Sequence, residues 1–157
     1  MSGPQGDVSP CSFRANYNPS LVHNMEQMTG ILSSKNKQWV DSRPKGRFDG
    51  TAPEPDKTLH SGHVLGTTNI PFYDMIDSQT KNLKDKAGLQ QEFEKAGIDL
   101  SKPLVVSCGG GLVAVMVAFT AHLLGKEVAV YDGSWTEWVQ NAPKETMHLG
   151  VKGEDLK

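Results

Sequence analysis

A single cysteine, Cys108, stands between an apolar run and three consecutive glycines in the stretch PLVVSCGGGLVAV, residues 103–115. The run before it predicts a buried strand, and the run after it predicts a helix. A cysteine at the end of a parallel strand lies where open α/β sheets place their active sites. The glycines can turn successive N–H groups toward one point, and the start of a helix adds partial positive charge. Together these features favour a nucleophilic thiolate at Cys108.

The same stretch allows two other interpretations. Gly109, Gly111 and Ala114 match the G-x-G-x-x-A pattern of dinucleotide-binding folds, and Asp132 ends the next expected strand. That pattern normally opens the first strand–helix–strand unit, whereas only one more strand is expected to follow here. The other alternative is a small cysteine packed in the core, which would not need three open glycines after it.

Two phosphate chemistries lack the residues that they require. The chain has no Gly-Lys-Ser or Gly-Lys-Thr triplet for a Walker loop. A cysteine phosphatase needs an arginine that closes the loop around the phosphoryl oxygens, and the far end of this loop reads Leu-Val-Ala. Nucleotide hydrolysis by a P-loop and phosphate transfer through Cys108 are therefore disfavoured.

The composition favours one globular domain in a reducing compartment. The chain has 157 residues, a formal net charge of −2 and scattered basic residues, which argues against nucleic-acid or membrane partners. No apolar run reaches the length of a membrane span, and no signal peptide is evident. Cys11 and Cys108 do not make a disulfide framework or a zinc site, and no metal or cofactor is expected. The cytoplasm is the expected location, with mitochondria as the alternative.

Apolar periodicity predicts alternating strands and helices, separated by one long Pro- and Gly-rich loop at 42–66. This alternation is typical of the α/β class, with a central parallel sheet and helices on both faces. We expect an extended leader at 1–17, the domain at 18–145 and a polar C-terminal tail at 146–157. The expected strands are residues 38–41, 67–72, 103–107 and 127–132, and the expected helices are residues 18–32, 89–97, 112–125 and 134–142.

The ends of three helices carry specific signals. Asn18 followed by Pro19 predicts the start of the first helix. Gly97 predicts the end of the second. Ser134, with Glu137 three positions later, predicts a capping box at the start of the last helix.

Four motifs spaced along the chain resemble those of a known family. In order along the chain they are VDSRPKGRFDGTAPEP, SGHVLGTTNIPF, LSKPLVVSCGGG and YDGSWTEW. From about Phe13 to Pro143 the chain resembles the C-terminal catalytic rhodanese domain of the mercaptopyruvate/thiosulfate sulfurtransferase family. The resemblance implies a rhodanese-like fold. It also implies an enzyme that moves a sulfane sulfur, through a cysteine persulfide, from a small anionic donor such as 3-mercaptopyruvate or thiosulfate. The implied acceptor is cyanide or a thiol, including a reducing protein thiol.

The resemblance also assigns roles to individual residues. Cys108 would form the persulfide, and Arg47 in GRF would grip the anionic group of the donor, the alternative being a solvated loop charge. The backbone that holds the donor and the persulfide would be that of Gly109, Gly110, Gly111, Leu112 and Val113. A scaffold role is expected for the Asp-x-Arg pair and for the histidine of GHVLG, while the two tryptophans are expected in the core and the pocket wall. These residues are Asp41, Arg43, His63, Trp135 and Trp138.

The chain departs from the family pattern at the site. Mercaptopyruvate enzymes typically read CGSGVT in the loop, so Gly110 and Val113 replace a serine and a threonine hydroxyl. Asp56 stands where relatives often place a second arginine. The family is usually a tandem of two such domains, of which this chain matches the catalytic half. These departures support an alternative function, a catalytically weakened module that carries sulfur or binds a partner protein.

Overall fold

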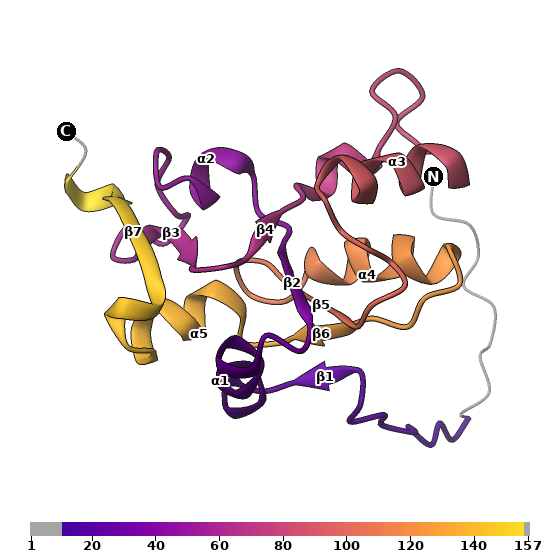
Figure 1. The fold of residues 1–157 in the computed structure, drawn as a ribbon, viewed down its shortest axis with the longest axis horizontal. Helices are drawn as coiled ribbons and strands as arrows, with labels where there is room; N and C mark the ends of the chain where they lie inside the picture. Colours follow the sequence, from indigo (N-terminus) through magenta and orange to yellow (C-terminus); the bar gives the residue numbers. More distant parts are fainter. Residues whose placement is uncertain (1–10, 156–157) are drawn as a thin grey trace.

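Five parallel strands form the central sheet in the computed structural model, which describes residues 11–155 (Figure 1). The strand order is β1-β6-β5-β2-β4, so β5, which leads to Cys108, lies in the middle. The predicted α/β class and parallel sheet are confirmed. The bounds are β1 (Val22–His23), β2 (Gln38–Asp41), β4 (Thr68–Asn69), β5 (Leu104–Ser107) and β6 (Ala129–Tyr131).

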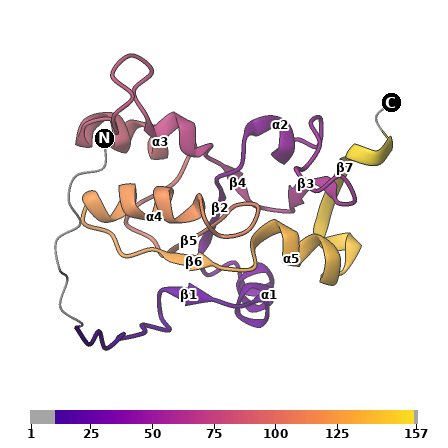
Figure 2. The same ribbon diagram turned by 180° about the vertical axis from the view of Figure 1, so that it is seen from behind.

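Helices cover both faces of this sheet. Figures 1 and 2 show α3 and α4 on one side of the strands, and α1 on the other. Helix α5 joins α1 in the same apolar cluster. Among the described residues, no helix is long and apolar enough to cross a membrane. The bounds are α1 (Met25–Ser34), α3 (Lys86–Lys95), α4 (Ala114–Leu123) and α5 (Ser134–Asn141), with short 3₁₀ turns η1 (Phe72–Met75), η2 (Lys144–Thr146) and η3 (Gly153–Asp155).

The alternation of side chains along β5 explains why its sequence is apolar throughout. Leu104 and Val106 pack in the cluster that contains α3 and α4, whereas Val105 packs in the cluster of α1 and α5. Successive side chains of a strand point to opposite faces, so a strand covered on both sides must be apolar at every position. The central strand is thereby fixed in register, and its C-terminal end holds Cys108 in a defined place.

A second, two-stranded sheet corrects two of the sequence-based expectations. The expected loop at 42–66 contains helix α2 (Lys45–Phe48) and strand β3 (His60–Val64). Strand β7 (Met147–Lys152) pairs antiparallel with β3, so most of the segment expected to be a polar tail is an ordered strand. A glycine in each strand had obscured this pairing: Gly62 in β3 faces the backbone of β7, where a Cβ would clash with the His148 carbonyl, and Gly150 interrupts β7.

Two helix starts also differ from the expectation. Helix α1 begins at Met25, where Asn24 and Gln27 form the capping box, while Asn18 instead accepts hydrogen bonds from Ser20. The capping box predicted for α5 is absent, because Ser134 Oγ donates to the Tyr131 carbonyl. Of the expected leader, residues 1–10 lie outside the described part, and residues 11–17 are exposed and form no helix or strand.

Candidate active site

Cys108 is the first residue after β5 and is 2% exposed. Its backbone N–H donates to Ser134 Oγ at 3.0 Å, and its carbonyl accepts from the Trp135 N–H at 3.0 Å. Ser134 has a φ of +53°, which is uncommon for a residue with a side chain. The strained turn between β6 and α5 therefore holds the backbone of Cys108 through these two hydrogen bonds.

The loop after Cys108 leaves a series of backbone donors unused. Within residues 11–155, none of the N–H groups from Gly109 to Val113 donates a hydrogen bond to a protein acceptor. Helix α4 starts directly after them, and Val113 supplies no side-chain cap. Unpaired N–H groups at the start of a helix attract an anion, because their partial positive charges add to that of the helix. The loop is thus a preformed cradle for negative charge next to Cys108.

The three glycines of this loop differ in what they permit. Gly111 has a φ of +81°, and a Cβ there would lie 2.7 Å from the Asp132 carbonyl oxygen. A Cβ at Gly109 would lie 2.9 Å from Nη2 of Arg47, whereas a Cβ at Gly110 would meet nothing within 4 Å. Both the backbone conformation and the lack of space therefore require glycine at position 111. At position 110 there is space for a side chain.

We expect Gly111→Ala to lower the free energy of unfolding by about 1–3 kcal/mol, because it adds a strained φ and a backbone clash. Urea unfolding followed by circular dichroism measures this effect. Gly110→Ala is the matched control, and its expected effect stays within about 0.5 kcal/mol. Equal effects of the two substitutions would contradict the assignment of the strained position to Gly111.

Arg47 is brought to this loop from α2. Its guanidinium lies against Gly109, and its side chain keeps 21% of its surface exposed. Arg47 Nε donates to Glu54 Oε2 at 3.0 Å, and Nη2 bonds to the same oxygen. The Arg47 guanidinium is thus held by a buried carboxylate, while part of the Arg47 side chain remains open to solvent. Arg47 and the loop residue Gly109, which are far apart in the sequence, thus lie side by side.

A buried ion-pair network holds Glu54 in turn. Its second oxygen accepts from Arg43 Nη1 at 2.7 Å, and Arg43, which is fully buried, also donates to the Asp41 carboxylate and to the Gly62 carbonyl. The Arg43 guanidinium stacks over the Trp135 ring, 4.5 Å from its centroid. The buried pair of Arg43 with Asp41 fits the scaffold role that the resemblance implies. Two carboxylates and two guanidiniums balance, so the network is close to neutral.

Other residues of the motifs have contacts that fit a scaffold role or an exposed position. The His63 ring stacks on Phe48, and its Nδ1 lies 2.8 Å from the Phe48 carbonyl oxygen. Trp135 and Trp138 are buried in the cluster of α1 and α5. Asp56 is exposed, and hydrogen bonds from Thr58 lower the pKa of its carboxyl group.

Sequence reasoning missed two residues that position the site. Glu54 connects Arg43 to Arg47, and Ser134 holds the N–H of Cys108. An acid between two prolines in PEP was the only available signal for Glu54. The serine was interpreted as a helix cap, since its position suits that role equally well. Its bond to Cys108 depends on a contact between segments 26 residues apart.

Comparison with known proteins agrees with this geometry. Residues 24–141 match the model of the rhodanese-like domain. The chain is 42% identical to human 3-mercaptopyruvate sulfurtransferase, over 98% of this chain and 52% of that protein. It is 47% identical to mouse thiosulfate sulfurtransferase, over 87% of this chain and 46% of that protein. The chain thus spans about half the length of these curated relatives.

Solved structures give the same result. The sulfur transferase subunit of yeast mitochondrial complex I superposes with a TM-score of 0.81 at 32% identity, covering 93% of this chain and 52% of that chain. The 3-mercaptopyruvate sulfotransferase SseA from Escherichia coli gives a TM-score of 0.66 at 30% identity, covering 79% and 45%. Fold, site geometry and sequence similarity lead to one conclusion: the chain belongs to the rhodanese-like domain family.

Proposed function

We propose that this chain is a sulfurtransferase that carries sulfur on Cys108 between a small anionic donor and a nucleophilic acceptor. The proposal rests on the cradle of unpaired N–H groups from Gly109 to Val113 directly after Cys108. Such a cradle stabilises an anion without supplying a proton that would neutralise it. The names of the curated relatives support this class of reaction.

In the first half-reaction the thiolate of Cys108 attacks the sulfur that the donor gives up, the outer sulfur of thiosulfate or the thiol sulfur of 3-mercaptopyruvate. With thiosulfate, the S–S bond of the donor breaks and sulfite leaves with the electron pair. With 3-mercaptopyruvate, the C–S bond breaks and the carbon takes up a proton to give pyruvate. Either way a persulfide remains on Cys108. Arg47, which lies beside Gly109, would bind the anionic oxygens of the donor through the exposed part of its guanidinium.

In the second half-reaction the acceptor attacks the outer sulfur of the persulfide. The S–S bond breaks, and its electron pair returns to Sγ of Cys108. Cyanide would leave as thiocyanate, and a low-molecular-weight or protein thiol would leave as its own persulfide. A reducing compartment, the cytoplasm or mitochondria, would supply such thiols.

The direct test charges the purified chain with thiosulfate or 3-mercaptopyruvate and measures its intact mass. We expect a gain of one sulfur, located on Cys108 by peptide mapping, and release of that sulfur as thiocyanate on adding cyanide. A charged protein that releases sulfur only negligibly would favour the sulfur-carrier alternative. No mass gain with either donor would contradict the proposal.

The loss of the loop hydroxyl leads to a further prediction. We expect Gly110→Ser to raise kcat/KM for 3-mercaptopyruvate by about tenfold, the scale of one added hydrogen bond in a transition state. A serine fits there, since a Cβ meets nothing within 4 Å. Steady-state pyruvate formation measures the effect, and Gly110→Ala controls for the added carbon. Equal rates in the two variants would show that the hydroxyl has no role.

A further inference from the structure

The start of α5 hydrogen-bonds two carbonyl groups of the active-site loop. The Trp135 N–H donates to the carbonyl oxygen of Cys108 at 3.0 Å, and the Thr136 N–H donates to that of Gly109 at 2.9 Å. The first N–H groups of a helix have no partner within the helix itself. In α5, two of these N–H groups therefore bind two successive carbonyl groups of the loop.

These two bonds determine which way the N–H groups of the loop face. In a trans peptide unit the C=O and the N–H point in opposite directions, and none of the described peptide bonds is cis. Because the Cys108 carbonyl points at α5, the N–H of Gly109 points away from α5. The Gly109 carbonyl orients the N–H of Gly110 in the same way. Neither N–H donates to an acceptor within residues 11–155, so both are left free for a bound anion.

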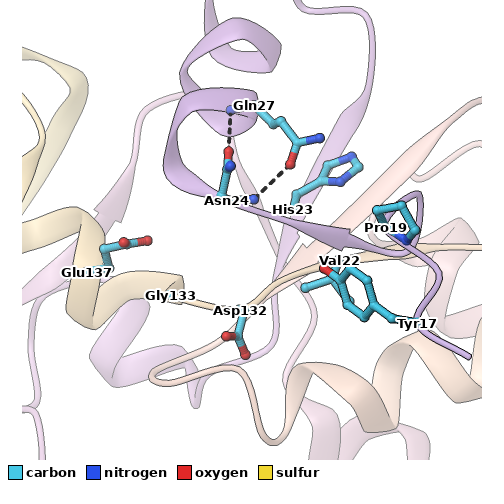
Figure 3. Close-up of a pocket in the computed structure, with 9 residues that line it drawn as sticks. All are labelled: Tyr17, Pro19, Val22, His23, Asn24, Gln27, Asp132, Gly133 and Glu137. Atoms are coloured by element: carbon cyan, nitrogen blue, oxygen red, sulfur yellow. Dashed lines mark hydrogen bonds between the residues drawn. The ribbon is translucent and has the colours of Figure 1, made fainter. Parts of the chain in front are cut away.

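A short connection brings α5 to the loop. Strand β6 ends at Tyr131 and α5 begins at Ser134. Only Asp132 and Gly133 lie between them, and Figure 3 shows both beside the pocket that they help to line. The loop packs on this connection, since a Cβ at Gly111 would lie 2.7 Å from the Asp132 carbonyl oxygen. Ser134 has a φ of +53°, which a residue with a side chain keeps only where its surroundings hold it.

The hydroxyl of Ser134 holds this turn in place. It accepts the N–H of Cys108 at 3.0 Å and donates to the carbonyl of Tyr131 at 2.7 Å. Cys108 directly follows β5 and Tyr131 ends β6, so the hydroxyl joins the ends of two neighbouring strands and fixes the first residue of α5 between them. Ser134 is fully buried, and its hydroxyl can donate and accept at once, which the side chains of alanine and glycine cannot.

We infer that Ser134 is a positioning residue for sulfur transfer. Its hydroxyl holds the start of α5 against the loop, and α5 in turn keeps the N–H groups of Gly109 and Gly110 available to the anion formed at Cys108. This inference rests on the proposed function and explains how the cradle is oriented before a substrate binds. N–H groups that are oriented in advance stabilise the charge that develops during a reaction.

The kinetic test uses Ser134→Ala and Ser134→Gly, which both lack the hydroxyl. Glycine also removes the strain of the left-handed conformation, so the two variants separate strain from hydrogen bonding. We expect single-turnover charging at saturating thiosulfate to slow by about 10- to 100-fold in both variants, since a misaligned donor loses most of its effect. The thiosulfate concentration that gives half the maximal rate should change by less than about twofold, because Arg47 keeps its contacts.

Ser61→Ala is the matched control. It removes an equally buried hydroxyl, which donates to the Val151 carbonyl at 3.0 Å between β3 and β7. We expect this control to lose stability and to keep its charging rate. A charging rate that is restored in Ser134→Gly would overturn the inference, because strain and not the hydroxyl would then limit the reaction. An unchanged rate in Ser134→Ala would overturn it as well.

Amide hydrogen exchange tests the turn without any sulfur chemistry. In uncharged Ser134→Ala, we expect the Trp135 and Thr136 amides to exchange about tenfold faster than in the unmodified chain. The amides of Val105 and Val106, in the central strand, report any global loss of stability. If Trp135 and Thr136 accelerate no more than this strand does, the inference fails whether or not Cys108 takes up sulfur. If even the unmodified chain takes up no sulfur, the proposed function fails, while hydrogen exchange still decides whether the hydroxyl holds the turn.

Discussion

The Cys108→Ser variant is expected to form no thiocyanate above the uncatalysed background, with thiosulfate or with 3-mercaptopyruvate. Sulfur transfer by the proposed route passes through a bond between Sγ of Cys108 and the donated sulfur. A serine hydroxyl is a far weaker nucleophile at neutral pH and has no base beside it in the described residues to activate it. The expected loss is therefore complete rather than partial.

The substitution leaves the fold of the site in place. The bonds from Cys108 to Ser134 and Trp135 are made by the backbone N–H and carbonyl, which serine keeps. We expect a thermal midpoint close to that of the unmodified chain, measured by circular dichroism. Cys11→Ser is the matched control, because Cys11 is exposed and lies in the extended segment before β1. Thiocyanate formation by Cys108→Ser, or its loss in Cys11→Ser, would assign the reaction to another group.

The part of the site that could be predicted from sequence is the part built by local signals. The apolar run at 103–107 and the glycines after it were sufficient to place Cys108 at the end of a buried strand. Local composition also predicted α3, α4 and the parallel sheet, because burial on both faces requires uninterrupted apolar strands. The start of α1 was wrong because Asn18 and Asn24 are both acceptable caps, and only pairing of β1 with β6 selects the second.

The part that could not be predicted depends on contacts between distant segments. Strands β3 and β7 are separated by more than 80 residues, and β3 has no regular alternation of apolar and polar side chains. Strand β7 does alternate, with apolar Met147, Leu149 and Val151, but nothing local in the sequence identifies its distant partner. Glu54 looks like an ordinary loop acid until the fold buries it between two arginines. Its burial makes sense only with both partners present, since an isolated buried carboxylate would be strongly unfavourable.

Removing that carboxylate should have the largest effect on stability of any single substitution considered. We expect Glu54→Ala to lower the free energy of unfolding by about 3–5 kcal/mol, because it leaves the buried guanidinium of Arg43 with Asp41 as its one carboxylate partner among residues 11–155. The same change frees Arg47, whose guanidinium is held against Gly109 by Glu54. Urea unfolding curves, extrapolated to water, measure the loss of stability.

The matched control is Asp49→Ala, which breaks an exposed pair between the residue that ends α2 and Lys45 at its start. A pair of this kind contributes less than about 0.5 kcal/mol, so the two substitutions should differ at least fivefold. A loss of about 1 kcal/mol or less in Glu54→Ala would show that the network does not depend on its central carboxylate. Glu54→Gln then separates positioning from folding. It keeps the shape and one acceptor oxygen, and should remain folded. A neutral amide holds the Arg47 guanidinium in place less firmly than a carboxylate does. The KM of the Glu54→Gln variant for anionic donors should therefore rise more than its kcat falls.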